Sequence, residues 1–295
     1  MNGVPAGGAH RQAELVDRLI QLSIAEDIGD GDHTSKACIP AAAQGKMKLL
    51  VKQDGILAGV EAARRVFGMI DPLAVMTAAI ADGAPVKAGD VAFHVEGAVH
   101  SLLQAERTVL NMMQRMSGVA TQTAAYVKQL DGLKTRVLDT RKTTPGMRML
   151  DKLAVRLGGG ENHRTGLFDM ILIKDNHIDF SGGVEKALNN VRAYLERTSR
   201  KLAVEIEVRT LDDVKTVLRT GGVQRIMLDN FSLDDTRKAV GLIAGKYETE
   251  SSGGITLQTI RDYAECGVDF ISVGALTHQI KSLDMSLKYE LGIKN

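Results

Sequence analysis

The chain has 295 residues, of which 44% are hydrophobic and 25% charged, so it is long enough for one large globular domain or two moderate ones. Its formal net charge of +1 argues against a general role in binding nucleic acid or a membrane surface. No apolar run approaches the roughly 20 residues that a membrane span needs. The two cysteines, Cys38 and Cys266, lack metal-ligand spacing, and a reducing cytoplasm is therefore the expected location.

The first part of the sequence reads as a mixture of helices and short strands. Residues 1–10 are rich in Gly and Ala, lack the apolar core of a signal peptide and are expected to be disordered. Apolar residues then recur at helical spacing from about residue 11 to 25, and a second helix is expected to start at Glu61. Asp-Gly pairs separate short strands. The expected strands are residues 47–51, 55–60, 74–81 and 91–99.

A long helical pattern follows over residues 101–130, and Ser117-Gly118 could break it. From Lys134 onward, short apolar runs alternate with helical segments, which indicates parallel strands joined by right-handed crossovers. Such a chain forms either a doubly wound sheet or a βα barrel. The expected strands are residues 136–139, 170–174, 203–208, 225–229, 246–250 and 270–273, and helices are expected to start near Met147, Val184, Leu211, Leu233 and Leu257.

Polar residues and glycines follow each of these six strands. Polar residues and glycines at the C-terminal ends of successive parallel strands are typical of the active face of a βα barrel. An open sheet instead concentrates its site at one switch point between two strands. The pattern therefore favours the barrel. The residues concerned are Arg141, Lys142, Lys174, Asp175, Arg209, Asp229, Asn230, Ser252, Gly253, Gly254 and Gly274.

Positive side chains cluster between residues 139 and 177, although the chain as a whole is nearly neutral. Arg matches the geometry of carboxylates and phosphates, and Lys supplies a compact charge, so the cluster suits a small ligand with several negative charges. Glu205 and Glu207 alternate with apolar residues on one expected strand, and their burial requires a cation or a metal as partner. Glu207, nearer the C-terminal end of the strand, is the better functional candidate.

Glycine loops at Ser252-Gly253-Gly254 and at Gly274 precede expected helices. Backbone N–H groups in such loops can hold a phosphate.

Several motifs together resemble the quinolinate phosphoribosyltransferase family, over nearly the whole chain after the first ten residues. They are Thr-Arg-Lys-Thr-Thr-Pro-Gly at 140–146, Gly-Gly-Gly at 158–160 with Asn162-His163-Arg164, Ile-Lys-Asp-Asn-His at 173–177, Met-Leu-Asp-Asn at 227–230, Ser-Gly-Gly-Ile-Thr at 252–256 and Ser-Val-Gly-Ala-Leu-Thr-His at 272–278.

The resemblance implies an α/β fold. An α+β sandwich domain would cover residues 11–116, and an incomplete βα barrel of six or seven strands would cover residues 117–280. Residues 281–295 would return to the first domain. It also implies a homodimer or a larger dimer-based assembly in which Arg107 of one subunit reaches the neighbouring site.

The reaction implied by the resemblance joins quinolinate to phosphoribosyl pyrophosphate and gives nicotinate mononucleotide, pyrophosphate and carbon dioxide, a step of NAD biosynthesis. The implied catalytic residues are Lys142, Lys174, Glu207 and Asp229. Quinolinate would be held by Arg107, Thr140, Arg141, His163, Arg164 and Lys174. Phosphoribosyl pyrophosphate would be held by Lys142, Glu207, Asp229, Ser252, Gly253, Gly254 and Gly274, with Mg²⁺ on Glu207 and Asp229.

The sequence leaves some roles and alternatives open. Lys142 and Lys174 could act as acids or bases or only as charges, and Arg148 could line the site or lie on a helix surface. A paralogue of the same fold, such as the pyrophosphorylase-like protein associated with molybdate transport, would act on a different acid. A silent phosphate-binding scaffold and a nucleic-acid-binding protein are the alternatives from other classes, and the neutral charge disfavours the second.

Overall fold

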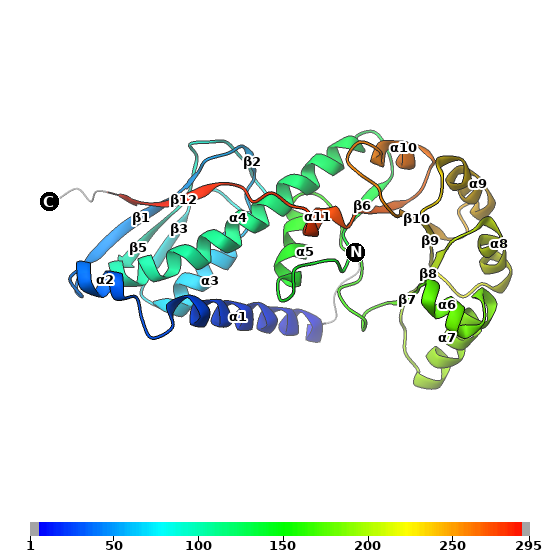
Figure 1. The fold of residues 1–295 in the computed structure, drawn as a ribbon, viewed down its shortest axis with the longest axis horizontal. Helices are drawn as coiled ribbons and strands as arrows, with labels where there is room; N and C mark the ends of the chain where they lie inside the picture. Colours follow the sequence, from blue (N-terminus) through cyan, green and yellow to red (C-terminus); the bar gives the residue numbers. More distant parts are fainter. Residues whose placement is uncertain (1–5, 291–295) are drawn as a thin grey trace. The chain divides into compact units, whose positions relative to one another are not determined.

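The computed structural model describes residues 6–290 and divides the chain into two compact units (Figure 1). Unit 1 consists of Met1–Ala124, Thr143–Gly159 and Thr277–Asn295, and unit 2 of Ala125–Lys142 and Gly160–Leu276. The disorder expected for residues 1–10 falls partly, at residues 1–5, outside the described residues. Residues 6–10 begin the first helix.

An antiparallel sheet forms the centre of unit 1. Its strands largely alternate buried residues with more exposed ones, the period of two that a sheet with one buried face requires. Met47, Leu49 and Val51 of the first strand are buried in this way. The last strand of the chain lies beside the first, so the C-terminal segment returns to the N-terminal unit (Figure 1). In spatial order the strands are β12 (Met285–Glu290), β1 (Gln44–Val51), β5 (Val91–Ala98) and β3 (Val75–Ala78), and a separate pair joins β2 (Gly55–Ile56) to β4 (Pro85–Val86).

Helices pack on this sheet through apolar faces. Phe67 meets Phe93 of β5 edge to face, with 6.0 Å between the ring centroids. Arg65 holds Asp17 at 2.9 Å and so joins two of the helices. The strand expected at residues 55–60 is shorter, because Val60 already begins a helix. The helices of unit 1 are α1 (Ala6–Ile28), α2 (His33–Cys38), α3 (Val60–Ile70) and α5 (Arg148–Leu157), with most of α4 (Val99–Gln129).

Helix α4 is continuous, so the break considered at Ser117-Gly118 does not occur. The Ser117 hydroxyl instead donates to the Ala58 carbonyl and accepts from the Ala58 N–H. It thereby gives both backbone polar groups of this buried residue a hydrogen-bond partner. A Cβ on Gly118 would lie 2.4 Å from the Lys281 carbonyl oxygen, because the returning chain crosses the helix there. The two residues serve this close packing, and the domain boundary expected at residues 116 and 117 falls inside the helix.

Replacing Gly118 with alanine is expected to destabilise the protein by about 2 kcal/mol, the usual cost of forcing an extra carbon into a filled core. The obstacle is backbone, which cannot rotate away as a long side chain would. Denaturant unfolding measures the loss, with Gly68→Ala as the control, since nothing lies within 4 Å of a Cβ on Gly68. Equal stability of the two variants would contradict the explanation.

Unit 2 contains a sheet of six parallel strands, and all six runs expected from the sequence are found. The fifth lies two residues later than expected. The first and second strands of this unit along the chain, β6 and β7, lie at opposite ends of the sheet and do not pair, so the barrel is incomplete within residues 6–290. Beyond β6, one isolated parallel bridge joins Leu138 to Glu161. The order is β6 (Arg136–Leu138), β11 (Phe270–Ser272), β10 (Glu248–Ser252), β9 (Arg225–Asp229), β8 (Val204–Val208) and β7 (Ile171–Ile173).

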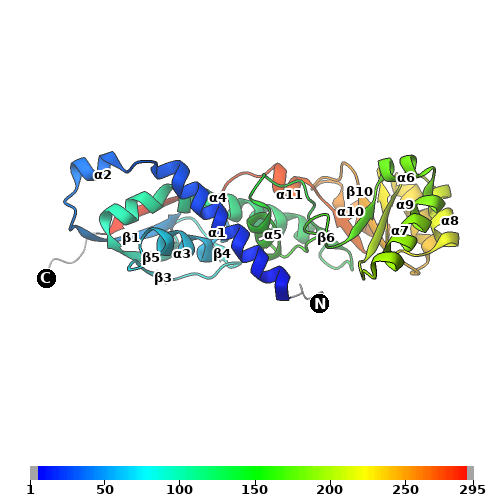
Figure 2. The same ribbon diagram turned by 90° about the horizontal axis from the view of Figure 1, so that it is seen from below.

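Helices between the strands cover one face of this sheet (Figures 1 and 2). They bury apolar stripes such as Val214 and Val217. The expected starts at Val184, Leu211 and Leu233 are confirmed, while the helix expected near Leu257 begins at Ile260. The helices are α6 (Asp175–Ser181), α7 (Val184–Thr198), α8 (Leu211–Thr220), α9 (Leu233–Ile243) and α10 (Ile260–Glu265), and α11 (Ala275–His278) lies where unit 2 ends.

None of the helices between residues 6 and 290 is long and apolar enough to cross a membrane.

Candidate functional site

The second face of the unit 2 sheet carries charged residues, because laterally paired residues point to the same side. Glu205 of β8 pairs in register with Arg225 of β9, and Arg225 with Glu248 of β10. One step along, Glu207 pairs with Met227, which pairs with Glu250. Glu205 and Glu207 are both buried, which confirms the expectation that these carboxylates do not face solvent.

The nearest partner of Glu207 is Lys174, which follows the end of β7. The Lys174 ammonium lies 2.7 Å from Oε2 of Glu207, whose side chain is only 8% exposed. A buried carboxylate requires such a cation. The pair thus places one charge of each sign at the C-terminal ends of two neighbouring strands.

Two arginines bring further positive charge to these strand ends. Arg164 is half-buried, and burial together with the charge of Arg141 lowers the pKa of its guanidinium, while Asp169 and Glu205 oppose the shift. The Arg164 guanidinium also donates to the Met170 carbonyl at 3.3 Å. The charges of the two guanidinium groups thus act on each other, and a bound anion would relieve the repulsion.

Strands β9 and β10 end in two loops that fit against each other. Asn230 adopts a left-handed φ of 54° and donates through Nδ2 to Oδ2 of Asp229 at 2.7 Å. A Cβ on Gly253, at φ 99°, would lie 2.2 Å from Oδ1 of Asn230, so only glycine fits. The glycine loop is separated from α10 by residues 255–259, so it does not open onto that helix as expected, whereas Gly274 directly precedes α11.

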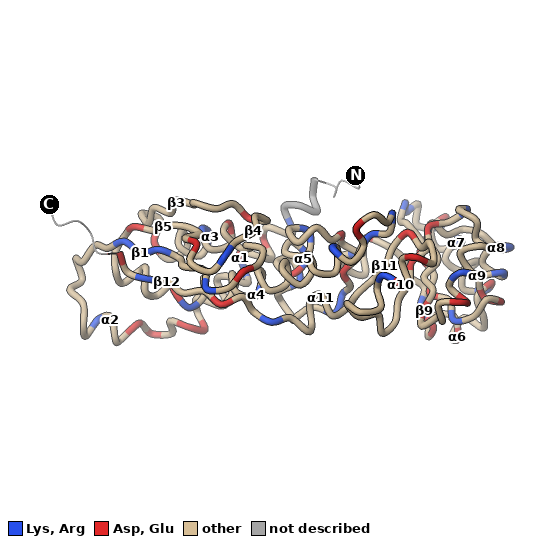
Figure 3. The backbone as a smooth tube through the Cα atoms, turned by 90° about the horizontal axis from the view of Figure 1, so that it is seen from above, with Lys and Arg blue, Asp and Glu red and all other residues tan. Residues whose placement is uncertain are grey.

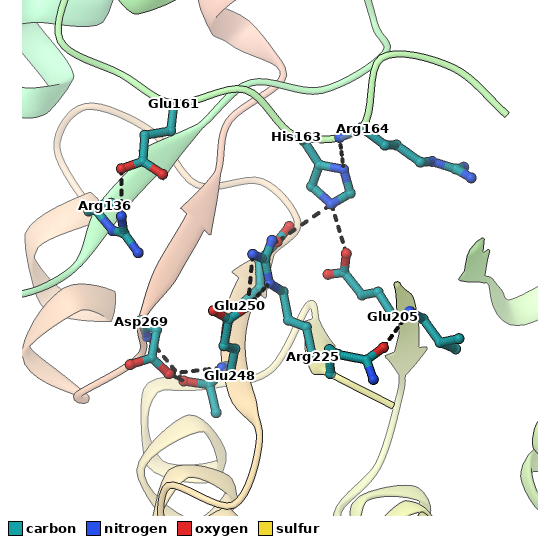
Figure 4. Close-up of polar contacts among 12 residues, drawn as sticks. Arg136, Glu161, His163, Arg164, Glu205, Arg225, Glu248, Glu250 and Asp269 are labelled. Carbon is teal, nitrogen blue, oxygen red and sulfur yellow. Dashed lines mark hydrogen bonds and ion pairs between the residues drawn. The ribbon is translucent and has the colours of Figure 1, made fainter. Parts of the chain in front are cut away.

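The ring of His163 makes three polar contacts, which Figure 4 draws as dashed lines. Its Nδ1 accepts the Arg164 backbone N–H at 2.7 Å. Its Nε2 lies 2.9 Å from Oε2 of Glu205 and 3.6 Å from Oε2 of Glu250. The backbone N–H of His163 donates to Oδ1 of Asp139 at 2.9 Å, which ties the segment to the end of β6.

The two carboxyl groups beneath His163 share one counterion. Arg225 lies 3.0 Å from Oε2 of Glu250 and stacks on the ring of Phe270 at 4.0 Å. Burial raises the pKa of Glu205 to about 7, against the charge of Arg225. Burial, reinforced by the charge of Glu205, raises the pKa of Glu250 to about 7. Near neutral pH the pair therefore holds a proton more readily than free carboxyl groups do.

This shift predicts a pH dependence of stability. The pKa of Glu250 in the folded protein lies above the ordinary value of 4.5, so its contribution is present below that value and lost as the pH rises through about 7. We expect the drop in unfolding free energy from about pH 5 to about pH 8 to be about 1–3 kcal/mol smaller in Glu250→Gln than in the unaltered protein. Denaturant titrations check it. Glu248→Gln, which alters the half-exposed second partner of Arg225, is the control, and an equal drop in all three proteins would refute the prediction.

Comparisons with known proteins agree along almost the whole chain. The family described as "Quinolinate phosphoribosyl transferase, N-terminal domain" matches residues 32–117, and its C-terminal-domain counterpart matches residues 119–288. The chain belongs to the quinolinate phosphoribosyltransferase family. It is 48% identical to "Quinolinate phosphoribosyltransferase [decarboxylating] 1" of Nicotiana glauca over 92% of this chain and 81% of the relative. It is 39% identical to a "Probable nicotinate-nucleotide pyrophosphorylase [carboxylating]" of Bacillus subtilis over 93% of both chains.

Solved structures of the quinolinate phosphoribosyltransferase family show the same two-unit fold. The nicotinate-nucleotide pyrophosphorylase of Francisella tularensis superposes with a TM-score of 0.89 at 40% identity and covers 98% of both chains. NadC of Streptococcus pyogenes superposes with a TM-score of 0.88 at 40% identity, over 93% of this chain and 97% of that one. The α+β domain followed by an incomplete barrel, expected from the resemblance, is thus confirmed.

Most of the residues that the family resemblance points to lie in unit 2 at the C-terminal ends of its strands. Thr140 and Lys142 follow β6, where the Thr140 hydroxyl accepts the Lys142 N–H at 3.0 Å and the Lys142 side chain is exposed. The guanidinium of Arg209 instead forms an ion pair with the carboxylate of Asp179, with 2.7 Å between nitrogen and oxygen. Those at the strand ends, or in the loop that leads to β7, are Thr140, Arg141, Lys142, His163, Arg164, Lys174, Glu207, Asp229, Ser252, Gly253, Gly254 and Gly274.

Two arginines that the family resemblance raised lie in unit 1 and therefore outside this group. Arg107 is exposed on α4, next to Thr108. A hollow of about 300 Å³ in unit 1 is lined by Thr108, Arg115 and Asp27, among others. Arg148 begins α5 and donates to the Thr143 hydroxyl at 3.2 Å, so its described contact belongs to the packing of unit 1.

Sequence reasoning missed Glu250, Arg225 and Asp139. The signal for Glu250 was present, because Glu248 and Glu250 alternate on β10 as Glu205 and Glu207 do on β8. The strand was expected at residues 246–250, two residues too early, so the similarity between Glu248 and Glu250 on β10 and Glu205 and Glu207 on β8 was not apparent. Nothing in the local sequence marks Arg225 as the counterion of two carboxylates on different strands.

Proposed function

We propose that this chain is a quinolinate phosphoribosyltransferase, which forms nicotinate mononucleotide, pyrophosphate and carbon dioxide from quinolinate and phosphoribosyl pyrophosphate in de novo NAD biosynthesis. The observation that carries the proposal is the group of cations in unit 2 at the end of β6, in the loop that leads to β7 and at the end of β7: Arg141 and Arg164, whose charges act on each other, and Lys174, which pairs with Glu207. A pyridine with two adjacent carboxylates supplies two negative charges for such a group. The names of the relatives support the same substrate.

In this proposal Arg141, Arg164 and Thr140 bind the two carboxylates of quinolinate, and Lys174 lies at its edge. The ring nitrogen then bonds to the anomeric carbon of the ribose as pyrophosphate leaves. The nitrogen becomes positive, so the carboxylate beside it leaves as carbon dioxide and its electron pair stays on the ring carbon, which takes a proton. Positioning and charge placement do most of the work.

The sugar donor would lie toward β8, β9 and β10. Glu207 and Asp229 end neighbouring strands on the same face of the sheet and would face the ribose, where positive charge develops as pyrophosphate departs. Lys142, exposed beyond β6, would meet the pyrophosphate. The backbone of Ser252, Gly253, Gly254 and Gly274 would hold the 5′-phosphate. These roles are inferred from the family resemblance together with the positions of the residues.

Glu207 and Asp229 also suit a magnesium ion that arrives with the donor. Mg²⁺ is usually held by one or two carboxylates together with substrate phosphates, which is what these two strand ends offer. When bound, the ion would neutralise charge on the leaving pyrophosphate. Lys174 holds Glu207 in place for either partner.

The assembly is part of the proposal. We infer a homodimer, or a larger dimer-based assembly, in which Arg107 enters the site of the neighbouring subunit. The exposure of Arg107 on α4 supports this role. Cytoplasmic location remains an inference from the low cysteine content. Lys and Arg are mixed with Asp and Glu along both units, which gives no support to a nucleic-acid-binding role (Figure 3).

The test is release of carbon dioxide from carboxyl-labelled quinolinate, with and without phosphoribosyl pyrophosphate and magnesium. We expect release only when the donor is present, since ribosylation precedes loss of the carboxylate. Nicotinate, offered in place of quinolinate, should give no nucleotide. Turnover of a different acid but not of quinolinate would favour the paralogue, and binding of neither substrate in calorimetry would favour a silent scaffold.

Replacing Asp229 with alanine is expected to impair use of the sugar donor, while quinolinate binding stays within about threefold of the unaltered value. We expect kcat/KM for phosphoribosyl pyrophosphate to fall about 100-fold, the cost of one well-placed charged contact in a transition state. Steady-state kinetics and quinolinate calorimetry measure the two effects. Asp234→Ala, an exposed carboxylate on α9, is the control. A weaker quinolinate affinity with unchanged donor kinetics would mean that the two subsites are exchanged.

A further inference from the structure

Both ring nitrogens of His163 face protein groups. Nδ1 lies 2.7 Å from the backbone N–H of Arg164 and accepts its hydrogen bond, and Nε2 faces Oε2 of Glu205 at 2.9 Å and of Glu250 at 3.6 Å. The side chain is only 5% exposed. Figure 4 shows the ring between the backbone above and the carboxyl groups below.

These contacts fix which nitrogen carries the ring proton. An acceptor nitrogen cannot also hold a proton, so Nδ1 is unprotonated and the proton of the neutral ring lies on Nε2. Nε2 therefore faces Oε2 of Glu205 as a close polar contact at 2.9 Å, outside hydrogen-bond geometry. A substrate carboxylate placed there would meet two buried carboxyl groups.

Two further contacts anchor this segment. The N–H of His163 donates to Asp139, which is fully buried at the end of β6. The Arg164 guanidinium reaches the Met170 carbonyl just before β7. The backbone between His163 and Arg164 is thus held from the end of β6, from the buried carboxyl groups and from the approach to β7.

We propose that His163 is a positioning residue, which joins the backbone of Arg164 to Glu205 and Glu250 and so aims the Arg164 guanidinium, without contacting the substrate. This differs from the role in quinolinate binding expected from the family resemblance. It rests on the proposed function, because the anion that Arg164 is aimed at is quinolinate. Glu205 and Glu250 act in the same chain of contacts, one step further from the substrate.

A metal ion is the competing explanation of this cluster. The ligand atoms of His163, Glu205 and Glu250 lie within 4.8 Å of one another, a grouping that could hold one. The cluster already has a cation, since Arg225 lies 3.0 Å from the Glu250 oxygen that faces the ring. A metal bound at Nε2 would also have to displace the ring proton that the neutral ring carries there.

Two amide substitutions separate positioning from direct binding. In His163→Asn the side-chain oxygen can stand where Nδ1 stands and accept the Arg164 N–H, whereas in His163→Gln the amide N–H₂ reaches the place of Nε2. If His163 positions Arg164, Asn keeps the quinolinate affinity within about threefold, while Gln and Ala weaken it about 30-fold, by the loss of one aimed charged contact. If His163 binds substrate through Nε2, Gln keeps the affinity and Asn loses it, which overturns the proposal.

A measurement on the unaltered protein avoids any failure of a variant to fold. Long-range ¹H–¹⁵N spectra of ¹⁵N-histidine protein report which ring nitrogen carries the proton. We expect His163 to show an unprotonated Nδ1 and a protonated Nε2, unchanged by saturating quinolinate or by a chelator. A shift of Nε2 on adding quinolinate, or a metal-bound Nε2 that a chelator releases, would overturn the proposal.

A histidine in unit 1 provides the control for these substitutions, and the unaltered protein provides the reference affinity. His100→Ala removes another partly buried histidine, bonded through Nε2 to the Ile39 carbonyl in unit 1, and should leave quinolinate affinity unchanged. If the unaltered protein binds no quinolinate, the proposed function is overturned, and positioning for that substrate with it. If it binds quinolinate and Gln alone restores affinity, only the positioning role is overturned.

Discussion

Replacing Arg164 with alanine is expected to lower kcat/KM for quinolinate by about 1,000-fold, or about 4 kcal/mol. The guanidinium is half-buried, and its pKa is lowered by burial and by the charge of Arg141, a cost that a bound anion would offset. Arg164→Lys keeps the charge but loses the two-pronged geometry, and should recover only part of the activity. Steady-state kinetics with quinolinate as the varied substrate measures both.

The control for this experiment is Arg237→Ala, which removes an exposed arginine paired with Asp234 on α9. It should retain full activity. Quinolinate affinity, measured by calorimetry without the donor, should fall in Arg164→Ala in parallel with kcat/KM. If Arg164→Ala turned over quinolinate as well as Arg237→Ala does, the anion site would have to be sought elsewhere.

The largest effect on stability is expected from Asp151→Ala in unit 1. Asp151 is fully buried and accepts two hydrogen bonds from Arg115, at 2.9 and 2.8 Å, while Arg115 also donates to the Thr277 carbonyl. Removing the carboxylate leaves a mostly buried guanidinium without its counterion, which typically costs about 3–5 kcal/mol. Denaturant unfolding at neutral pH measures the loss.

Two further variants show whether the cost comes from the charge left behind. Asp151→Asn keeps the shape and one acceptor, and should lose less than Asp151→Ala. The double variant Arg115→Met with Asp151→Leu removes both charges, so it should recover much of the stability. A double variant as unstable as Asp151→Ala would show that packing, and not the unpaired charge, sets the cost.

Periodicity in the sequence found the strands of unit 2 because each is a short apolar run between helical stretches. The polar residues after them were correctly placed at strand ends, since a residue that comes directly after a strand in the chain must lie close to its end. The strand that ends at Ser252 was misplaced by two residues, because Glu248, Glu250 and two serines do not look apolar. Glu250 and Ser251 are buried all the same, and Arg225 and His163 supply partners for Glu250 from elsewhere in the chain.

Long-range pairing is what local patterns could not supply. Gly118 reads as a helix breaker in the sequence, but its true neighbour is the Lys281 carbonyl, more than 160 residues later. Residues 143–159, which include Arg148, belong to unit 1, whereas the stretches before and after them belong to unit 2. Only tertiary contacts assign them.

By itself, the sequence determined the family, the alternation of strands and helices in unit 2, and the cluster of cations that suits a doubly charged acid. Tertiary structure alone decided that His163 directs both ring nitrogens to protein atoms, and that Glu205, Glu250 and Arg225 form one buried group. The physical reason is that a residue type and its spacing fix what a side chain can bond. Which partner it meets depends on strands brought together by folding, and in the low dielectric of a core that partner fixes its protonation state.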